Sequence, residues 1–219
     1  MITRSITFKT LCIILPLCAA AIITAGASRT ANAQGPQPLY WQIGAVDKND
    51  SEFALAPSKW SSYKADALYV IGSSNPATDW PYVQPGPDDQ WAGGRAHTNS
   101  IYFGLANVIA EGDCKLTLSL LDAQKPYSPT LQITVNGQSW TKQTVPGGGD
   151  LSINGQPDKG IPSTVSIDFP SSLLRKGVNT VTITTTQGSW ILYDAVTMNG
   201  PAEDVLMSLP QFAQIQSAE

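Results

Sequence analysis

The sequence has few of the side chains on which most catalytic sites depend. It contains one histidine, His97, and neither G-x-S-x-G nor H-E-x-x-H, the patterns of many serine hydrolases and zinc proteases. Carboxylates are then the main candidates for acid–base chemistry. A glycosidase needs two carboxyl groups roughly 5–10 Å apart across a cleft. Asp79 with Asp88 or Asp89 is a conceivable pair, but nothing in their spacing requires it.

The sequence also lacks an apolar run long enough to serve as a stable membrane span. The run at residues 11–25 is interrupted by Pro16, whereas about 20 consecutive apolar residues are needed to cross a bilayer. A basic segment precedes this run, and the small-x-small sequence Ala31-Asn32-Ala33 follows it. This order is typical of a secretory signal peptide. Residues 1–33 are therefore predicted to be removed, leaving a secreted or periplasmic protein.

Cysteine and positive charge are scarce in the predicted mature chain. Cys12 and Cys18 lie in the signal peptide, so Cys114 remains alone and can form no intrachain disulfide. It is predicted to be a small buried hydrophobic residue. Charged residues make up 14% of the whole chain, the formal net charge is −4, and no basic patch is evident. These features argue against nucleic acid and anionic membrane surfaces as partners, and they are compatible with a monomer.

Short runs of alternating apolar and polar residues, separated by turn-forming residues, dominate the rest of the sequence. Such alternation is typical of strands with one buried face. The predicted strands lie at residues 39–44, 67–72, 100–106, 114–120, 130–135, 138–143, 165–169, 179–186 and 190–198. Asn136-Gly137 is the strongest hairpin signal. Residues 171–177 resemble one helical turn closed by a glycine. We predict an all-β sandwich over residues 34–201, followed by a tail or linker at 202–219.

The segment at residues 176–201 is predicted to close the sandwich as a β-hairpin, with its turn at residues 187–189. Asp194 lies among apolar neighbours in the second strand of this segment. Burying a carboxylate without partners is costly. We therefore predict that Asp194 is a structural hydrogen-bond anchor and not a catalytic acid.

Four groups of short motifs occur in order between residues 40 and 200. They are Trp41-Gln42-Ile43-Gly44 with Asp47 and Glu52-Phe53; Tyr69-Val70-Ile71-Gly72 with Asp79-Trp80-Pro81; Val135-Asn136-Gly137; and Leu174, Gly177 and residues 179–183 with 189–194. Together they resemble the C-terminal carbohydrate-binding-like domain (domain III) of polysaccharide lyase family 4, the rhamnogalacturonan lyases. The resemblance implies a jelly-roll, galactose-binding-like β-sandwich. It also implies an absence of lyase chemistry here, because that chemistry resides in a separate, larger domain of the family.

A loop at residues 79–97 carries the densest group of aromatic and polar side chains. Aromatic rings can stack on sugar rings, and carboxylates, amides and guanidinium groups can bind hydroxyls. The predicted ligand-binding residues are Asp79, Trp80, Tyr82, Trp91, Arg95 and His97. Arg95 and His97 could also pair with the carboxylate of a uronate. Packing at the end of the sandwich is the alternative, favoured for Trp80. Trp41 and Trp190 are expected in the core.

The sequence Asp47-x-Asn49-x-Ser51 has the oxygen spacing of the start of a calcium loop. Glu52 stands where such a loop needs glycine, and Ser58 stands where it needs its last carboxylate. A capped turn is therefore the favoured interpretation. No cofactor or metal is predicted, with a structural calcium as the alternative.

The leading functional prediction is an exported, non-catalytic carbohydrate-binding module for a plant-type polysaccharide, with rhamnogalacturonan as one candidate. Two alternatives stay open. One is a small polysaccharide lyase or glycosidase acting on the same polymers. The other is a structural sandwich that contacts a protein partner, which a wide exposed apolar patch without an aromatic groove would favour.

Overall fold

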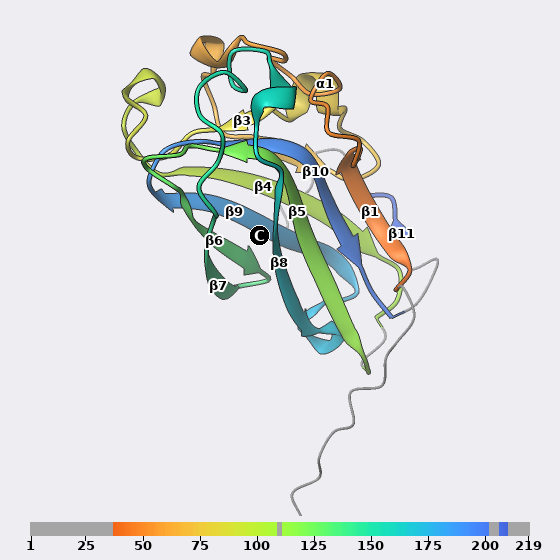
Figure 1. Ribbon diagram of the computed structural model, residues 1–219. Helices are drawn as coiled ribbons and strands as arrows, with labels where there is room; N and C mark the ends of the chain where they lie inside the picture. Colours follow the sequence, from red (N-terminus) through yellow and green to blue (C-terminus); the bar gives the residue numbers. More distant parts are fainter. Residues whose placement is uncertain (1–36, 109–110, 202–205, 210–219) are drawn as a thin grey trace, which may run out of the picture. The chain divides into compact units, whose positions relative to one another are not determined.

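Two β-sheets packed face to face form the part of the chain that the structure, a computed structural model, describes: residues 37–108, 111–201 and 206–209 (Figure 1). Sheet I has the order β1 (Leu39–Gly44), β10 (Ile191–Asn199), β5 (Asp113–Ala123) and β8 (Ser163–Pro170), with β3 (Val83–Gln84) also paired to β10. Sheet II has the order β11 (Leu206–Met207), β4 (His97–Leu105), β9 (Gly177–Gln187), β6 (Thr130–Val135) and β7 (Gln138–Gln143), with β2 (Leu68–Val70) parallel to β4.

Short helical turns lie in the loops between these strands. They are η1 (Trp60–Ser62), α1 (Pro76–Asp79), η2 (Gln90–Ala92), η3 (Pro157–Lys159) and η4 (Ser171–Leu173). Figure 1 places α1, β3 and the loop between β7 and β8 at the same end of the sandwich. None of the helices in the described residues is long and apolar enough to cross a membrane.

The core follows the alternating patterns of the sequence. In β5, Cys114, Leu116, Leu118 and Leu120 are all buried, and the alternate apolar residues of β4, β6, β8 and β9 pack in the same cluster. Cys114 is fully buried, as predicted, and burial raises the pKa of its thiol to about 12. The predicted hairpin at Asn136-Gly137 joins β6 to β7. The all-β sandwich expected from the sequence is therefore the observed architecture.

The prediction of a closing hairpin is wrong, because its two strands belong to different sheets. Strand β9 pairs with β4 and β6 in sheet II, whereas β10 pairs with β1 and β5 in sheet I. Each strand has both edges occupied by other neighbours, so the two cannot pair with each other. The chain crosses between the sheets at Ser189, whose N–H donates to the Tyr127 carbonyl at 2.9 Å.

Asp194 is the structural anchor that the sequence predicted. It lies where the register between β10 and β5 shifts, and it is 4% exposed. Its Oδ1 accepts backbone N–H groups of Lys48 at 2.9 Å and Asp47 at 3.3 Å. Burial raises the pKa of Asp194, and these donors oppose that effect. The carboxylate thereby ties the loop after β1 to sheet I.

In that loop, side chains accept hydrogen bonds from the backbone two residues further on, as in the capped turn that the sequence favours. The Asn49 N–H donates to Asp47 Oδ1 at 3.0 Å, and the Ser51 N–H donates to Asn49 Oδ1 at 2.9 Å. The side-chain oxygens of the 1-3-5 pattern therefore accept hydrogen bonds from the loop's own backbone. Within the described ranges, no three or more His, Cys, Asp or Glu side chains are grouped as a metal ion would require.

Two segments differ in detail from the sequence predictions. The expected helical turn at residues 171–177 is the shorter η4, and Gly177 instead begins β9 with a φ of +88°. Within the predicted tail or linker, Leu206 and Met207 pair with β4 as β11. The rest of that tail beyond Leu209, residues 202–205 and the signal peptide predicted at 1–33 lie outside the described residues.

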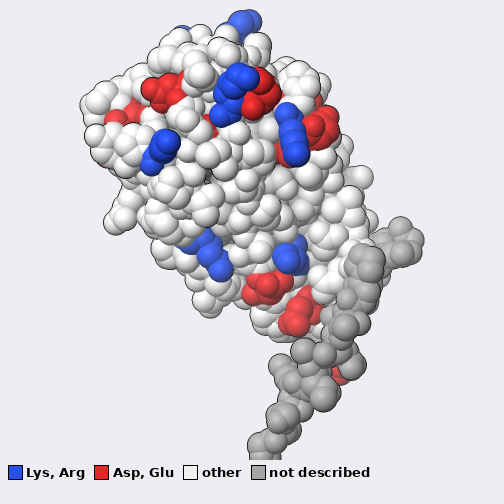
Figure 2. All heavy atoms as spheres, in the orientation of Figure 1, with Lys and Arg blue, Asp and Glu red and all other residues white. Residues whose placement is uncertain are grey.

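Figure 2 shows the face of the molecule over β5 and β8. Charged side chains gather toward its two ends, and the middle of this face carries almost none. In the middle of β5 and β8 the alternate residues are small and polar, among them Thr117, Ser119 and Ser166. The middle of this face therefore carries little charge.

Asp50 predicts a pH dependence of stability. It is 1% exposed, its Oδ2 has no hydrogen-bond partner, and burial raises its pKa from 3.8 to about 6. A raised pKa in the folded state means that stability is lost as pH rises from about 4 to above 6. One pKa unit corresponds to about 1.4 kcal/mol, so the loss is at most about 3 kcal/mol.

We expect Asp50→Asn to remove most of this loss. Urea unfolding near pH 4 and near pH 7 measures it, with the exposed Asp168→Asn as the control. An unchanged pH dependence in Asp50→Asn would show that Asp50 keeps its ordinary pKa.

Candidate functional site

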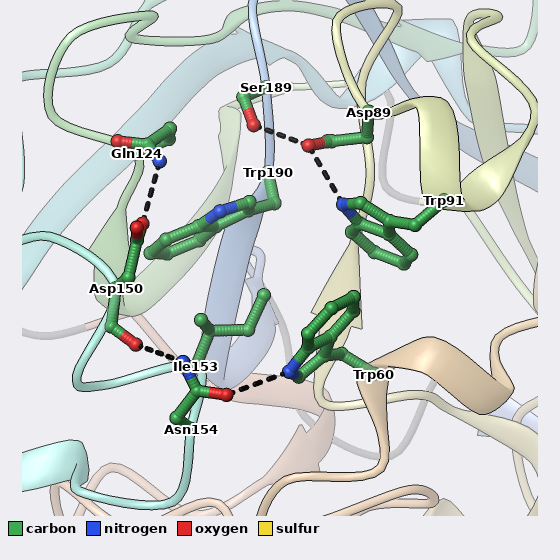
Figure 3. A pocket seen from close by; sticks show the side chains of 9 residues that line it. All are labelled: Trp60, Asp89, Trp91, Gln124, Asp150, Ile153, Asn154, Ser189 and Trp190. Carbon is green, nitrogen blue, oxygen red and sulfur yellow. Dashed lines mark hydrogen bonds between the residues drawn. The ribbon is translucent and has the colours of Figure 1, made fainter.

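A cavity of about 220 Å³ lies among the loops and is lined by three of the protein's six tryptophans. Its lining residues are Trp60, Asp89, Trp91, Gln124, Asp150, Ile153, Asn154, Ser189 and Trp190 (Figure 3). They come from η1, η2, the end of β5, the loop before β8, and the crossing between β9 and β10. Five separate segments of the chain thus converge on one concave site.

Aromatic rings form most of its apolar surface. The rings of Trp60 and Trp91 meet edge to face with centroids 5.1 Å apart, and both side chains are partly exposed. Figure 3 shows them on one side of the cavity, with Trp190 on the other side and Ile153 between. Trp190 is 3% exposed, so it belongs to the core, as predicted, and also lines the cavity.

A chain of hydrogen bonds fixes the polar rim. Trp60 Nε1 donates to Asn154 Oδ1 at 3.0 Å, and Asn154 Nδ2 donates to the Asp150 carbonyl at 2.7 Å. Gln124 Nε2 donates to Asp150 Oδ1 at 2.8 Å. Because these groups hold one another in place, a ligand would order few additional side chains, which lowers the entropy cost of binding.

Asp89 positions the wall formed by Trp91. It is 4% exposed and accepts hydrogen bonds from Trp91 Nε1 at 3.1 Å, Ser189 Oγ at 2.5 Å and the Gly86 N–H at 2.8 Å. Burial raises the pKa of Asp89, and the three donors oppose this. Its oxygens are therefore already engaged, and the residue acts through Trp91.

Asp122 positions the opposite rim in a similar way. It is fully buried and accepts hydrogen bonds from Gly148 N–H at 2.7 Å, Ile161 N–H at 3.2 Å and Ser152 Oγ at 2.5 Å. A Cβ on Gly147 would lie 1.9 Å from the Ala123 carbonyl oxygen, so the loop packs directly against β5. This loop carries Asp150, Ile153 and Asn154 to the cavity.

Two of the predicted ligand-binding residues lie in the hydrophobic core. Trp80 and Tyr82 are fully buried, so direct contact with a ligand is corrected to a packing role. The Trp80 ring packs at 5.9 Å from Tyr69 and 5.2 Å from Tyr193. Tyr82 Oη donates to the Ile153 carbonyl at 2.7 Å and so supports the cavity from below.

Three further predicted residues do not line the cavity. His97 is 1% exposed, which leaves it no surface for a ligand, and its Nδ1 lies 2.6 Å from Asp66 Oδ1. Arg95 is exposed and donates through Nη1 and Nη2 to the same carboxylate at 3.2 and 3.1 Å. Asp79 caps the short helix α1, accepting from the Asn75 N–H at 2.8 Å.

The Asp66 carboxylate explains why Arg95 and His97 come together. Burial acts to raise the pKa of Asp66, but hydrogen bonds from the Thr98 N–H, Arg95 and His97 outweigh it and lower that pKa. The Arg95 guanidinium group, which was predicted to pair with the carboxylate of a uronate, thus binds a carboxylate of the protein itself. Of the six predicted residues, Trp91 alone lines the cavity.

Sequence reasoning missed most of the lining. Trp60 and Asp150 belong to loops whose positions depend on tertiary contacts, and Trp190 was assigned to the core alone. One feature of the sequence could have indicated how the rim is held. Asp122 directly follows Leu120-Leu121, so it is an acidic residue in an apolar run, as Asp194 is. Asp79 and Asp88 are not among the lining residues, so the conceivable carboxylate pair does not face across this cavity.

A larger cavity of about 370 Å³ lies beside the loop after β1. It is lined by Val46, Asp47, Lys48, Ser119, Leu120, Pro162, Ser163, Thr164 and Asp194. It contains no aromatic ring. Flat apolar faces next to fixed hydrogen-bonding groups are present in the smaller cavity, which is therefore the stronger candidate.

Comparisons with known proteins agree with the motifs in the sequence. Residues 39–198 match the family described as CBM-like: polysaccharide lyase family 4, domain III. A rhamnogalacturonate lyase of Dickeya dadantii (strain 3937) is 29% identical over 175 residues, which cover 76% of this chain and 28% of that protein. The chain thus spans less than a third of the length of this relative.

Among solved structures, a family 35 carbohydrate-binding module from an environmental isolate is similar with a TM-score of 0.33 and 12% identity, covering 53% of this chain and 72% of that one. A family 35 module from Clostridium thermocellum has a TM-score of 0.32 and 14% identity, covering 47% and 69% of the two chains.

The anchoring role of Asp122 is testable. Asp122→Ala leaves two backbone N–H groups and the Ser152 hydroxyl without their acceptor, which should lower the free energy of unfolding by about 2–4 kcal/mol. Hydrogen exchange of residues 147–161 should accelerate more than that of β5. Asp168→Ala, an exposed change on β8, is the control. Unchanged exchange in this loop would show that Asp122 does not hold it.

Proposed function

This chain belongs to the CBM-like domain III family of polysaccharide lyase family 4, and we propose on that premise that it is an exported, non-catalytic carbohydrate-binding module. One observation carries the proposal: a concave site in which indole rings stand beside a fixed set of amide and carboxylate groups. We propose a plant-type polysaccharide as the ligand class, with rhamnogalacturonan as the first candidate.

The geometry suits a sugar because a pyranose ring has two kinds of surface. Its C–H groups form an apolar patch that can lie on an indole face, and partly exposed Trp60 and Trp91 offer such faces. Its hydroxyls both donate and accept hydrogen bonds. The side chains of Asn154 and Asp150 lie at the rim as partners for them. Both kinds of surface are therefore matched within one cavity.

A non-catalytic role agrees with the state of the carboxyl groups. Asp89 accepts three hydrogen bonds from the protein and is 4% exposed. Asp150 is the other acid in the lining, and its Oδ1 accepts from Gln124. A carboxyl that must give or take a proton during glycosidic cleavage has to reach the scissile bond, and Asp89 is enclosed by its donors.

Rhamnogalacturonan is proposed as the polymer because the relative from Dickeya dadantii described above is a rhamnogalacturonate lyase. This chain spans 28% of that protein, so the whole enzyme's activity is not carried over. Export is proposed from residues 1–33, which have the order of a signal peptide, and it would bring the module to a polymer outside the cytoplasm. The jelly-roll type of sandwich is likewise proposed from the family resemblance.

Trp91→Ala should weaken binding of rhamnogalacturonan oligosaccharides at least about tenfold, because it removes an aromatic anchor from a partly desolvated site. Isothermal titration calorimetry measures the change. Trp140→Ala is the matched control, because Trp140 is a partly buried tryptophan that packs against Phe169 and does not line the cavity.

The two variants separate binding from folding. Trp140→Ala should lower stability and leave affinity unchanged at a temperature where the variant is folded. If Trp91→Ala binds as tightly as the wild type, the ligand does not use this cavity. If the wild type binds none of the oligosaccharides, the carbohydrate-binding proposal fails for this polymer.

A further inference from the structure

We propose that the cavity accepts a neutral sugar unit and discriminates against uronates, an inference that rests on the carbohydrate-binding function proposed above. A polymer such as rhamnogalacturonan contains both neutral and acidic units. The sequence pattern suggested that Arg95 and His97 would recognise the acidic unit. The charges around the cavity indicate the opposite.

Among the residues that the structure describes, none of those lining the cavity carries a positive charge. Of its nine lining residues, two are acidic and none is Lys, Arg or His. A carboxylate ligand is normally met by a guanidinium or ammonium group that offers paired donors. Without one, a uronate would lose its hydration and gain no ionic partner in return.

Asp150 gives the rim a negative charge that forms no ion pair within the described residues. Its side chain is exposed, and its Oδ1 accepts a hydrogen bond from Gln124, an uncharged amide. The ion pairs within the described ranges join Asp66 to Arg95 and His97, and Asp158 to Lys159; none includes Asp150. A ligand carboxylate in the cavity would therefore be repelled.

A hydroxyl group has the opposite relation to the same carboxylate. It can donate to Asp150, forming a charge-assisted hydrogen bond that is stronger than one between neutral groups. A ring bearing only hydroxyls and C–H groups thus gains from Asp150, whereas a ring bearing a carboxylate is penalised by it. The discrimination follows from one side chain.

The size and floor of the cavity fit the same class of ligand. At about 220 Å³ it is smaller than the roughly 300–1,000 Å³ of pockets for drug-sized molecules. It therefore suits a single sugar ring better than a long chain segment. Trp190 and Ile153 add apolar surface to the lining, which favours the C–H face of the ring or an uncharged substituent at its edge.

A matched pair of ligands tests the inference directly. Rhamnogalacturonan oligosaccharides are compared with the same oligosaccharides after chemical reduction of their carboxylates to alcohols, which removes the charge and keeps every linkage. Calorimetric titration at low ionic strength should show the reduced form binding about threefold or more tightly, with the difference shrinking as salt is added.

Asp150→Asn should abolish most of that preference. Asparagine keeps an oxygen that can accept from Gln124 and removes the charge. Asp158→Asn is the matched control, because Asp158 lies in the same loop region and does not line the cavity. It should leave the preference as it is in the wild type.

The outcomes distinguish this inference from the proposed function. Tighter binding of the unreduced form, or a preference that Asp150→Asn leaves unchanged, would overturn neutral-sugar selectivity while carbohydrate binding stands. Failure of the wild type to bind either form would overturn the proposed function and the selectivity with it. A preference for the reduced form that Asp150→Asn removes would establish both.

Discussion

Buried carboxylates that collect hydrogen bonds from loop backbone are the interaction on which this structure depends. The strands satisfy their own N–H and C=O groups, but the long connections at the end of the sandwich cannot. Asp122, Asp89 and Asp194 each accept donors from such a connection, and Asp66 does the same for the start of β4. A carboxylate suits this task because its two oxygens can accept several hydrogen bonds at once.

The candidate site is a product of these anchors. Asp89 holds the indole N–H of Trp91, and Asp122 holds the loop that carries Asp150 and Asn154. The anchors lie behind the cavity while the rings and the rim face into it. The buried acids fix the loops, and the more exposed groups line the cavity. This arrangement explains why a domain with few charged residues places several of them in its interior.

Local pattern predicted much of the fold, because strand periodicity is a property of neighbouring residues. The strands and the turn at Asn136-Gly137 followed from it, and so did the role of Asp194 in an apolar run. The pattern did not reveal that β9 and β10 belong to different sheets. Alternation of apolar and polar residues shows which face of a strand is buried, but it does not show which strands pair with it. The site was harder still. Local density in sequence singled out Arg95 and His97, whereas in space these two bind Asp66 and leave the cavity to Trp60, Gln124 and Asp150.

The convergence of five segments on one cavity has a consequence for how the protein matures. Trp60 and Trp190 lie at nearly opposite ends of the described sandwich sequence, and the strand that follows Trp190 is central in sheet I. Contacts between such distant parts of a chain tend to form late in folding. The entropy cost of closing a long loop comes before the stabilising contacts that the closed loop makes. A chain that has not yet reached Ser189 and Trp190 lacks two of the residues that line the cavity. The complete cavity is therefore a property of the complete fold.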